Sequence, residues 1–177
     1  MQENKPVLVI GLGNPGKEYE NTRHNVGFMA IDALVPADSV WKKEKQALTT
    51  QAILNGKKCI FAKPQTFMNN SGESVLALMK FYKIPIENLI VFHDDMDLKV
   101  GTWKTKIGGG SAGHNGIKSI DALVGNNYTR YRIGIGHPRD FSSMTDPVDW
   151  VLGKFDKEQK SLINQTINNL ITTYIQL

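Results

Sequence analysis

The residues best suited to chemistry follow two apolar runs that are typical of buried strands. Asn14 comes shortly after the run VLVIGL, and Asp94 and Asp95 end the run NLIVFHDD. Open α/β sheets bind their ligands beside the carboxyl ends of such strands. The polar loop after Asn14 also carries His24, and a neutral imidazole can take a proton from water at physiological pH. Because a carboxylate can orient such an imidazole, these side chains predict a polar site.

Amide side chains precede or open two further runs that have helical periodicity. Asn69 and Asn70 stand before SGESVLALMKFY, and Asn115 opens NGIKSIDALVG. Asn70, with Glu73 three residues on, is expected to cap the first of these helices. The other amides could donate to a developing oxyanion without adding a charge. Amides, one carboxylate and one histidine together suit hydrolysis by an activated water, most easily of an ester, since an alkoxide leaves with less help than an amine.

The glycine motifs of the chain each have a competing interpretation. GLGNPG fits the dinucleotide pattern G-x-G-x-x-G, but Pro15 interrupts it and no apolar periodicity begins before Val26, whereas a dinucleotide turn leads directly into a helix. We therefore interpret it as a turn that presents Asn14. Residues 109–113 fit G-x-S-x-G around Ser111, yet a nucleophile elbow needs a sharp strand-to-helix turn. The run GGGSAGHNG is interpreted as a loop, either a flexible connector or a mobile gate over a site.

The four histidines predict no metal site, because their spacing matches no metal-binding motif. They are His24, His93, His114 and His137.

Strand and helix patterns alternate along the chain and predict the elements that must position these residues. Residues 101–107 alternate, which places Lys104 and Lys106 together on one side of a strand. One hairpin is expected around the turn Asn55-Gly56. This order predicts a single α/β domain over residues 1–177, a sandwich in which helices cover both faces of a mixed, mostly parallel twisted sheet. Strands are expected at 7–12, 50–54, 57–64, 88–95, 101–107 and 130–136, and helices at 25–34, 71–82, 115–125 and from 156 onward.

Composition excludes several classes of protein. The chain has 177 residues, of which 41% are hydrophobic, so it can build a core without staples. A single cysteine, Cys59, excludes an internal disulfide framework. No apolar stretch approaches the roughly 20 residues of a membrane span, and the start resembles no signal peptide, which predicts a cytoplasmic protein. The formal charge of +4 leans toward a polyanionic partner.

Five motifs in order resemble the bacterial peptidyl-tRNA hydrolase family. They are GLGNPGKEYENTRHNVGF, PQTFMNNSGESV, VFHDDMDL, KIGGGSAGHNGIKSI and YRIGIGHP, and the similarity extends to VLGKF, nearly the whole chain. The resemblance implies a single-domain, generally monomeric enzyme without metal or cofactor. Such an enzyme cleaves the ester that joins a peptide to the 3′ ribose of tRNA, and so recycles tRNA that has dropped from the ribosome. The partner implied is peptidyl-tRNA, not a membrane.

The resemblance also implies a role for each matching residue. His24 matches the catalytic base, Asp94 the residue that orients it, and Asn14 the asparagine that helps to distinguish blocked from free aminoacyl ends. The positions expected to contact the tRNA end and the peptide are Tyr19, Phe67, Asn69 and Asn115, with Met68 and His114 lining the same cleft. Basic positions near the tRNA path are Lys104, Lys106 and Arg132. Ser111-Ala112 departs from the more glycine-rich loops of the family. A serine esterase and a non-catalytic RNA-binding module remain the alternative hypotheses.

Overall fold

The computed structural model of the protein describes residues 1–176 and the side chains of residues 1–174. One seven-stranded sheet runs through it in the order β2-β3-β4-β1-β5-β7-β6. The pairs of β1 with β4, β1 with β5, and β5 with β7 are parallel, whereas the outer pairs are antiparallel. The predicted mixed sheet is therefore confirmed, with its parallel part at the centre. The strands are β1 (Val7–Gly11), β2 (Lys42–Glu44), β3 (Ala47–Leu54), β4 (Lys57–Pro64), β5 (Leu89–Asp95), β6 (Trp103–Ile107) and β7 (Thr129–Gly134).

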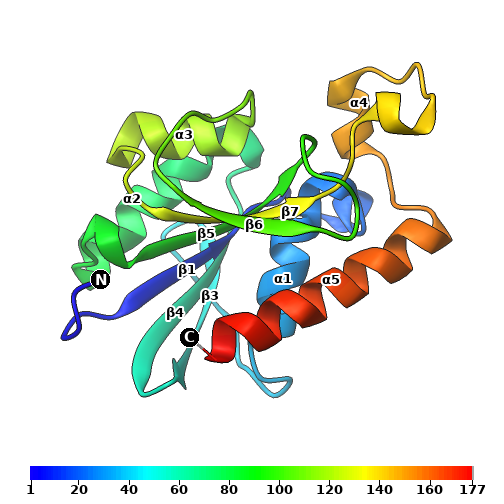
Figure 1. The fold of residues 1–177 in the computed structure, drawn as a ribbon. Helices are drawn as coiled ribbons and strands as arrows, with labels where there is room; N and C mark the ends of the chain where they lie inside the picture. The colour runs from blue at the N-terminus through cyan, green and yellow to red at the C-terminus, as the bar shows by residue number, and fades with distance from the viewer. Residues whose placement is uncertain (177) are drawn as a thin grey trace.

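Helices cover both faces of the sheet, as predicted. Figure 1 shows α2 and α3 on one face, α1 and the long α5 on the other, and α4 beyond one end of the strands. The helices are α1 (Val26–Leu34), α2 (Ser71–Tyr82), α3 (Asn115–Val124), α4 (Pro147–Leu152) and α5 (Lys157–Gln176). Single 3₁₀ turns are η1 (Lys17–Tyr19), η2 (Arg23–Asn25), η3 (Met68–Asn70), η4 (Ile86–Asn88) and η5 (Pro138–Phe141). None of the described helices is long and apolar enough to cross a membrane.

The alternation of β1 divides the apolar residues into two cores. Val7 and Val9 face α1 and α5, while Leu8 and Ile10 face α2 and α3. All four are at most 2% exposed, which agrees with a parallel strand that is buried on both faces. The central strands are therefore packed on both faces, and this packing fixes the positions at which the loops after their carboxyl ends begin.

A close contact of α1 brings the turn η2 to the carboxyl ends of β1 and β5. A β-carbon at Gly27 would lie 2.5 Å from the backbone nitrogen of Leu12 and 2.5 Å from the carbonyl oxygen of Phe92. Only glycine permits this approach. Because η2 directly precedes α1, His24 is carried to the same edge of the sheet as the end of β5.

The predicted cap of α2 is only partly correct. Asn70 occupies the N-cap position, but its side chain makes no capping hydrogen bond. The backbone turn η3 leads into the helix instead. The Ser71 hydroxyl donates to the carbonyl of Met68 at 2.8 Å and so satisfies a group in that turn. The capping box expected from Asn70 and Glu73 does not form, because η3 continues almost directly into α2.

Candidate active site

A cavity of about 510 Å³ opens at the carboxyl ends of the central strands, where polar residues from separate loops meet. Nine of the predicted site residues line it, and three basic ones do not. The lining residues are Asn14, Tyr19, His24, Phe67, Met68, Asn69, His93, Asp94, Asp95, Met96, Asp97, Ser111, Ala112, Gly113, His114, Asn115, Pro147, Val148, Val151 and Leu152.

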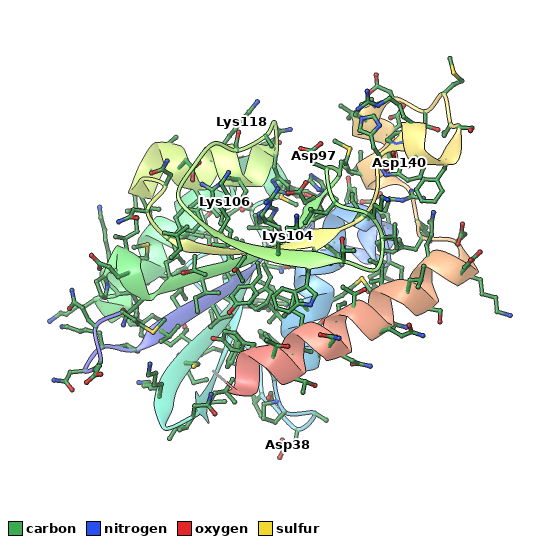
Figure 2. All side chains as sticks on the ribbon, viewed as in Figure 1. Asp38, Asp97, Lys104, Lys106, Lys118 and Asp140 are labelled. Atoms are coloured by element: carbon green, nitrogen blue, oxygen red, sulfur yellow. The ribbon has the colours of Figure 1, made fainter. Side chains whose placement is uncertain are left out.

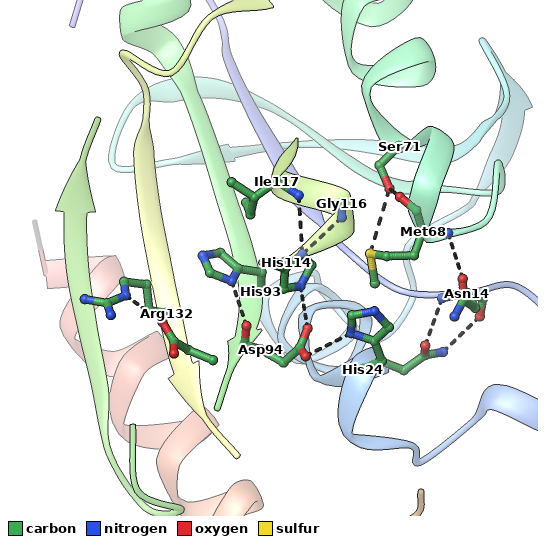
Figure 3. A network of polar contacts seen from close by, with 12 residues as sticks. Asn14, His24, Met68, Ser71, His93, Asp94, His114, Gly116, Ile117 and Arg132 are labelled. Carbon is green, nitrogen blue, oxygen red and sulfur yellow. Dashed lines mark hydrogen bonds and ion pairs between the residues drawn. The ribbon is translucent and has the colours of Figure 1, made fainter. Parts of the chain in front are cut away.

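His24 and Asp94 form a buried pair at the bottom of this cavity. Nδ1 of His24 lies 2.9 Å from Oδ2 of Asp94, and the two side chains are only 10% and 2% exposed. An ionised carboxylate accepts hydrogen bonds and cannot donate them. Nδ1 of His24 therefore carries the proton, and the lone pair of Nε2 is left for the cavity. Figure 3 shows the His24 ring between Asp94 on one side and Asn14 on the other.

A second histidine, His114, shares the same carboxylate. Its Nε2 lies 2.8 Å from Oδ1 of Asp94. Its Nδ1 accepts from the backbone N–H groups of Gly116 and Ile117 at 3.1 and 3.3 Å, as the N-cap of α3. Since Nδ1 is an acceptor, the proton of this ring lies on Nε2 and points at Asp94. The sequence placed His114 at a helix start but gave no signal of its contact with Asp94.

The third histidine near Asp94 is His93, which the sequence did not single out as a site residue. Its Nδ1 donates to the carbonyl of Asp94 at 2.8 Å, and its ring packs edge-on against His114. Burial, together with the neighbouring His114, lowers the pKa of His93 to about 3. This ring is therefore neutral at any working pH.

The environment tunes His24 for proton transfer. Burial alone would lower the pKa of His24, but the charge of Asp94 and its hydrogen bond outweigh burial, so the pKa is raised above its ordinary value. Burial would likewise raise the pKa of Asp94, but the two imidazoles hold it well below its usual range. Asp94 therefore stays ionised while His24 titrates, which is the arrangement that orients and stabilises an imidazolium.

Asn14 is oriented so that its amide group can donate into the cavity. Oδ1 of Asn14 accepts from the backbone N–H of Met68 at 2.7 Å, which fixes the amide because a backbone N–H requires an oxygen partner. The Nδ2 group is thus left for a ligand. The Asn25 side chain bonds both backbone polar groups of Asn14, at 2.8 and 2.9 Å. Sequence reasoning missed Asn25, and only its place next to His24 could have suggested it.

Phe67 holds a strained backbone conformation at the mouth of the cavity. Its φ is 61° and its ψ is 158°, a region that is essentially restricted to glycine and costs on the order of 1–3 kcal/mol. The side chain is 52% exposed, and its ring meets the edge of Tyr19 with centroids 6.2 Å apart. Such strain persists only where neighbouring contacts hold the backbone in place. Here the backbone N–H of the next residue, Met68, is held by its hydrogen bond to Asn14.

The outer part of the cavity combines amides and an apolar wall. Asn69 and Asn115 are exposed and line its opening. Helix α4 supplies four apolar residues that sequence reasoning missed, and we refer to them as the α4 wall: Pro147, Val148, Val151 and Leu152. Six residues are too few to show a helical period. The signal that could have found α4 was its start, since Asp146 caps it and Pro147 follows at the first position.

The glycine-rich loop before α3, residues 108–113, is held by hydrogen bonds from the side chain of Arg130. Nη1 of Arg130 donates to the carbonyl of Gly110 at 2.7 Å, and its Nη2 bonds both oxygens of Asp121. Asn126 donates to the carbonyl of Gly109 at 3.0 Å, and Gly109 itself has a φ of 82°. The loop leads directly to His114, so its anchoring helps to place the ring that contacts Asp94.

The three predicted basic residues lie outside the cavity, on the α3 side of the sheet. Lys104 is opposite Arg132, and Lys106 is opposite Arg130 in the pairing of β6 with β7, which puts all four on one face. Figure 2 shows Lys104 and Lys106 on this side, with Lys118 of α3 nearby. Arg132 is also bonded to Asp95, with Nε 2.8 Å from Oδ2, so much of its charge is balanced.

The side chains around Asp94 also place potential metal ligands together. One ligand atom each from His24, Asp94 and His114 lie within 4.8 Å of one another. A metal ion needs a lone pair from each imidazole. The hydrogen bonds described above place protons on the nitrogens that face Asp94, so this arrangement of donors does not fit an ion without breaking the cap of α3.

Comparisons of sequence identify one family. The sequence model of the family described as peptidyl-tRNA hydrolase matches residues 8–177. A peptidyl-tRNA hydrolase of Rickettsia bellii is 46% identical over 172 residues, which cover 95% of this chain and 91% of the relative. One of Ehrlichia ruminantium is 51% identical over 166 residues, covering 93% of this chain and 83% of the relative.

The comparison of structures leads to the same family. The crystal structure of peptidyl-tRNA hydrolase from Acinetobacter baumannii superposes with a TM-score of 0.90 at 36% identity, and the match covers 100% of this chain and 90% of that one. With the His24–Asp94 pair at the carboxyl ends of the central strands, these matches show that the chain belongs to the peptidyl-tRNA hydrolase family.

Proposed function

We propose that the chain hydrolyses the ester bond between a peptide, or an N-blocked aminoacyl group, and the 3′ ribose of tRNA, and so releases free tRNA. The observation that carries this proposal is the buried pair of His24 and Asp94, with Nδ1 and Oδ2 2.9 Å apart, in a cavity that also holds uncharged amide donors. The family match supplies the substrate class. The biological role that follows is recovery of tRNA from peptidyl-tRNA dropped by the ribosome.

In the proposed mechanism, His24 acts as the general base through Nε2. It takes a proton from a water as the water oxygen attacks the ester carbonyl carbon. Asp94 stabilises the imidazolium that forms and keeps the proton of Nδ1 in place. When the tetrahedral intermediate collapses, the ester C–O bond breaks and the 3′ oxygen of the ribose receives the proton from His24. Atoms and charge then balance, and the base is regenerated.

The amide side chains of the cavity are assigned to recognition and charge stabilisation. The free Nδ2 group of Asn14 is suited to donate to a carbonyl oxygen of the peptide, which a free aminoacyl end presents differently. Asn69 and Asn115 at the opening are assigned to the peptide and the ester. A hydrogen-bond donor aimed at a developing oxyanion typically contributes 10²- to 10³-fold in rate.

Recognition of the tRNA is assigned to two surfaces. Tyr19, Phe67 and Met68 border the cavity and offer ring and thioether surfaces to the terminal nucleotide. Lys104, Lys106 and Arg132 lie on the adjacent basic face and are assigned to phosphates. We propose that the chain acts as a monomer in the cytoplasm, where this substrate arises.

The proposal is tested by incubating the protein with N-blocked aminoacyl-tRNA and measuring free tRNA. Wild type is expected to release tRNA, and His24→Ala is expected to bind the substrate normally while turnover falls by about 10²- to 10⁴-fold. Binding without release by wild type would favour the RNA-binding module. Near-normal turnover by the variant would remove His24 as the base.

The serine esterase alternative depends on Ser111, which lines the cavity. Within the described residues, no hydrogen bond joins the Ser111 hydroxyl to His24, His93 or His114, whose ring nitrogens bond other groups or, for Nε2 of His24, face the cavity. A fluorophosphonate probe is expected to leave Ser111 unlabelled. Labelling, together with loss of turnover in Ser111→Ala, would favour the esterase mechanism.

A further inference from the structure

Arg23, the residue before His24, is a buried cation that forms no ion pair within the described residues, although the charge of Asp156 partly offsets the effect of burial on its pKa. Its exposed fraction is 7%, burial lowers its pKa, and no carboxylate lies within ion-pair distance of it in the part of the chain that the structure describes. Its Nε has no hydrogen-bond partner. A buried charge without an ion pair lowers the stability of the fold. The contacts of the side chain therefore indicate a role other than stabilisation.

The guanidinium of Arg23 joins the turn of His24 to two helices. Its Cζ lies 3.6 Å from the centroid of the Trp150 ring, and Nη1 donates to the carbonyl of Trp150 at 3.1 Å. Nη2 donates to Oε1 of Gln159 at 3.1 Å. Gln159 in turn exchanges hydrogen bonds with Asp156, the residue that precedes α5. One side chain thus fixes α4 and the start of α5 against η2.

Helix α4 turns one side to Arg23 and the other to the cavity. Trp150 is 7% exposed, and its Nε1 donates to the carbonyl of Gly136 at 2.9 Å. The α4 wall, which excludes Trp150, lines the cavity, and Val148 of this wall is 64% exposed. An exposed apolar surface beside a polar catalytic pair is suited to the apolar side chains of a substrate. The contact of Arg23 with Trp150 therefore joins that surface to the turn of His24, beside the backbone hydrogen bond from Arg23 to the carbonyl of Gly153 at 2.9 Å.

We propose that Arg23 is a positioning residue: it holds the α4 wall at its distance from His24 and thereby sets the affinity for substrates whose peptide carries apolar side chains. The inference rests on the proposed function and names a substrate preference of that site. Arg23 does not act through the charge of His24, because the groups that shift the pKa of His24 are its own burial and Asp94.

The experiment compares two substrates on one tRNA: N-acetylglycyl-tRNA and the same tRNA carrying an N-acetylated dipeptide of leucine. Because both share the tRNA, the ratio of their KM values reports the peptide alone. Failure of wild type to release tRNA from either substrate overturns the proposed function itself. For Arg23→Gln we expect KM for the leucine substrate to rise about tenfold, the scale of one altered apolar contact. KM for the glycine substrate, both kcat values and the pH inflection of kcat/KM are expected to stay at wild-type values.

A second variant reaches the same contact without removing a charge. A β-carbon at Gly153 would lie 2.6 Å from Nη1 of Arg23, and the φ of −77° at Gly153 accepts any residue. Gly153→Ala should therefore displace the guanidinium and raise the same KM ratio. The matched control is Arg139→Gln, which removes an exposed cation of the neighbouring turn and should behave as wild type.

Three results would overturn the inference. One is an equal change of KM on both substrates in Arg23→Gln. Another is a shifted pH inflection or a loss of kcat in that variant, which would place the effect on His24. The third is a wild-type KM ratio in Gly153→Ala, which decides the matter even where Arg23→Gln fails to fold.

Discussion

Nε2 of His114 donates to Oδ1 of Asp94 over 2.8 Å, so the carboxylate that pairs with His24 is shared by two imidazoles. Sharing divides the negative charge of Asp94 between two donors. A change to Asp94 and a change to His114 should therefore move the pKa of His24 in opposite directions, which makes the pair of variants more informative than either alone.

Asp94→Asn should lower the pKa of His24, because the charge that raises it is removed. The base form of His24 then appears at lower pH, so the acid-side inflection of kcat/KM moves to lower pH. Turnover should also fall, but by less than the roughly 10²- to 10⁴-fold expected for loss of the base, since an amide can still hold the ring. A pH series of kcat/KM measures both effects.

The control for this variant is Asp95→Asn. Asp95 bonds Arg132 and the backbone N–H of Asp97 rather than a histidine, so the pH inflection should stay unchanged. If Asp95→Asn lowered turnover and Asp94→Asn did not, Asp95 rather than Asp94 would be the acid that orients His24.

His114→Asn should move the acid-side inflection to higher pH. The shorter side chain cannot reach Asp94, so more of the carboxylate charge acts on His24 and raises its pKa. Asn still caps α3, whereas His114→Ala loses the cap as well and should lower the free energy of unfolding by about 0.5–2 kcal/mol. Urea unfolding and pH profiles of the two variants separate the roles, and an inflection at the wild-type pH in both would contradict the sharing of Asp94.

Phe67→Gly should be more stable than Phe67→Ala. Both variants lose the ring contact with Tyr19, but only glycine relieves the strain of a φ of 61°. Glycine also gives the unfolded chain more conformational entropy, which offsets part of this relief. The net difference in the free energy of unfolding should be about 1 kcal/mol in favour of Phe67→Gly. Both should have a lower kcat/KM than wild type. A Phe67→Ala protein at least as stable as Phe67→Gly would show that the conformation is not strained.

Lys104→Ala and Lys106→Ala should each raise KM for full-length substrate and leave kcat unchanged. Lost phosphate contacts reduce ground-state and transition-state binding alike, and the salt dependence of binding should become shallower by about one unit of slope per contact. Short blocked substrates without the tRNA body should not respond. The matched control is Lys58→Ala, an exposed lysine near the start of β4, which three strands separate from β6. Unchanged KM and salt slope would mean that the lysines only protect the edge strand β6.

Chelators should leave turnover unchanged. The ring nitrogens of His24 and His114 that face Asp94 hold protons in the hydrogen-bond network, so they offer no lone pair to an ion. Turnover is measured after dialysis against EDTA. If EDTA abolished activity and a divalent ion restored it, His24 could not be the only group that activates the water.

Local patterns explain why most elements of the fold could be predicted. The alternation of β1 and the apolar stripe of α5, with Ile163, Ile167 and Leu170 buried, are properties of short windows of sequence. The site residues Asn14 and Asp94 could be placed together because Asn14 follows β1 and Asp94 lies at the carboxyl end of β5 in the same sheet.

The remaining contacts depend on tertiary structure. No pattern relates Arg23 to Trp150, which lie 127 residues apart, and the tautomer of His114 depends on the first turn of α3. The strain at Phe67 could not be predicted, because glycine and asparagine indicate a positive φ in a sequence and phenylalanine does not. Such contacts complete the site, but they belong to no single segment.

The anchoring of the glycine-rich loop has a thermal consequence. Glycine loses more conformational entropy on folding than any other residue, so ordering residues 108–113 is unusually costly. The hydrogen bonds from Arg130 oppose that cost with enthalpy, while the entropic term grows with temperature. Because His114 is joined to this loop and to Asp94, we expect the site to come apart at a temperature set by the loop, below the temperature at which the sheet itself melts.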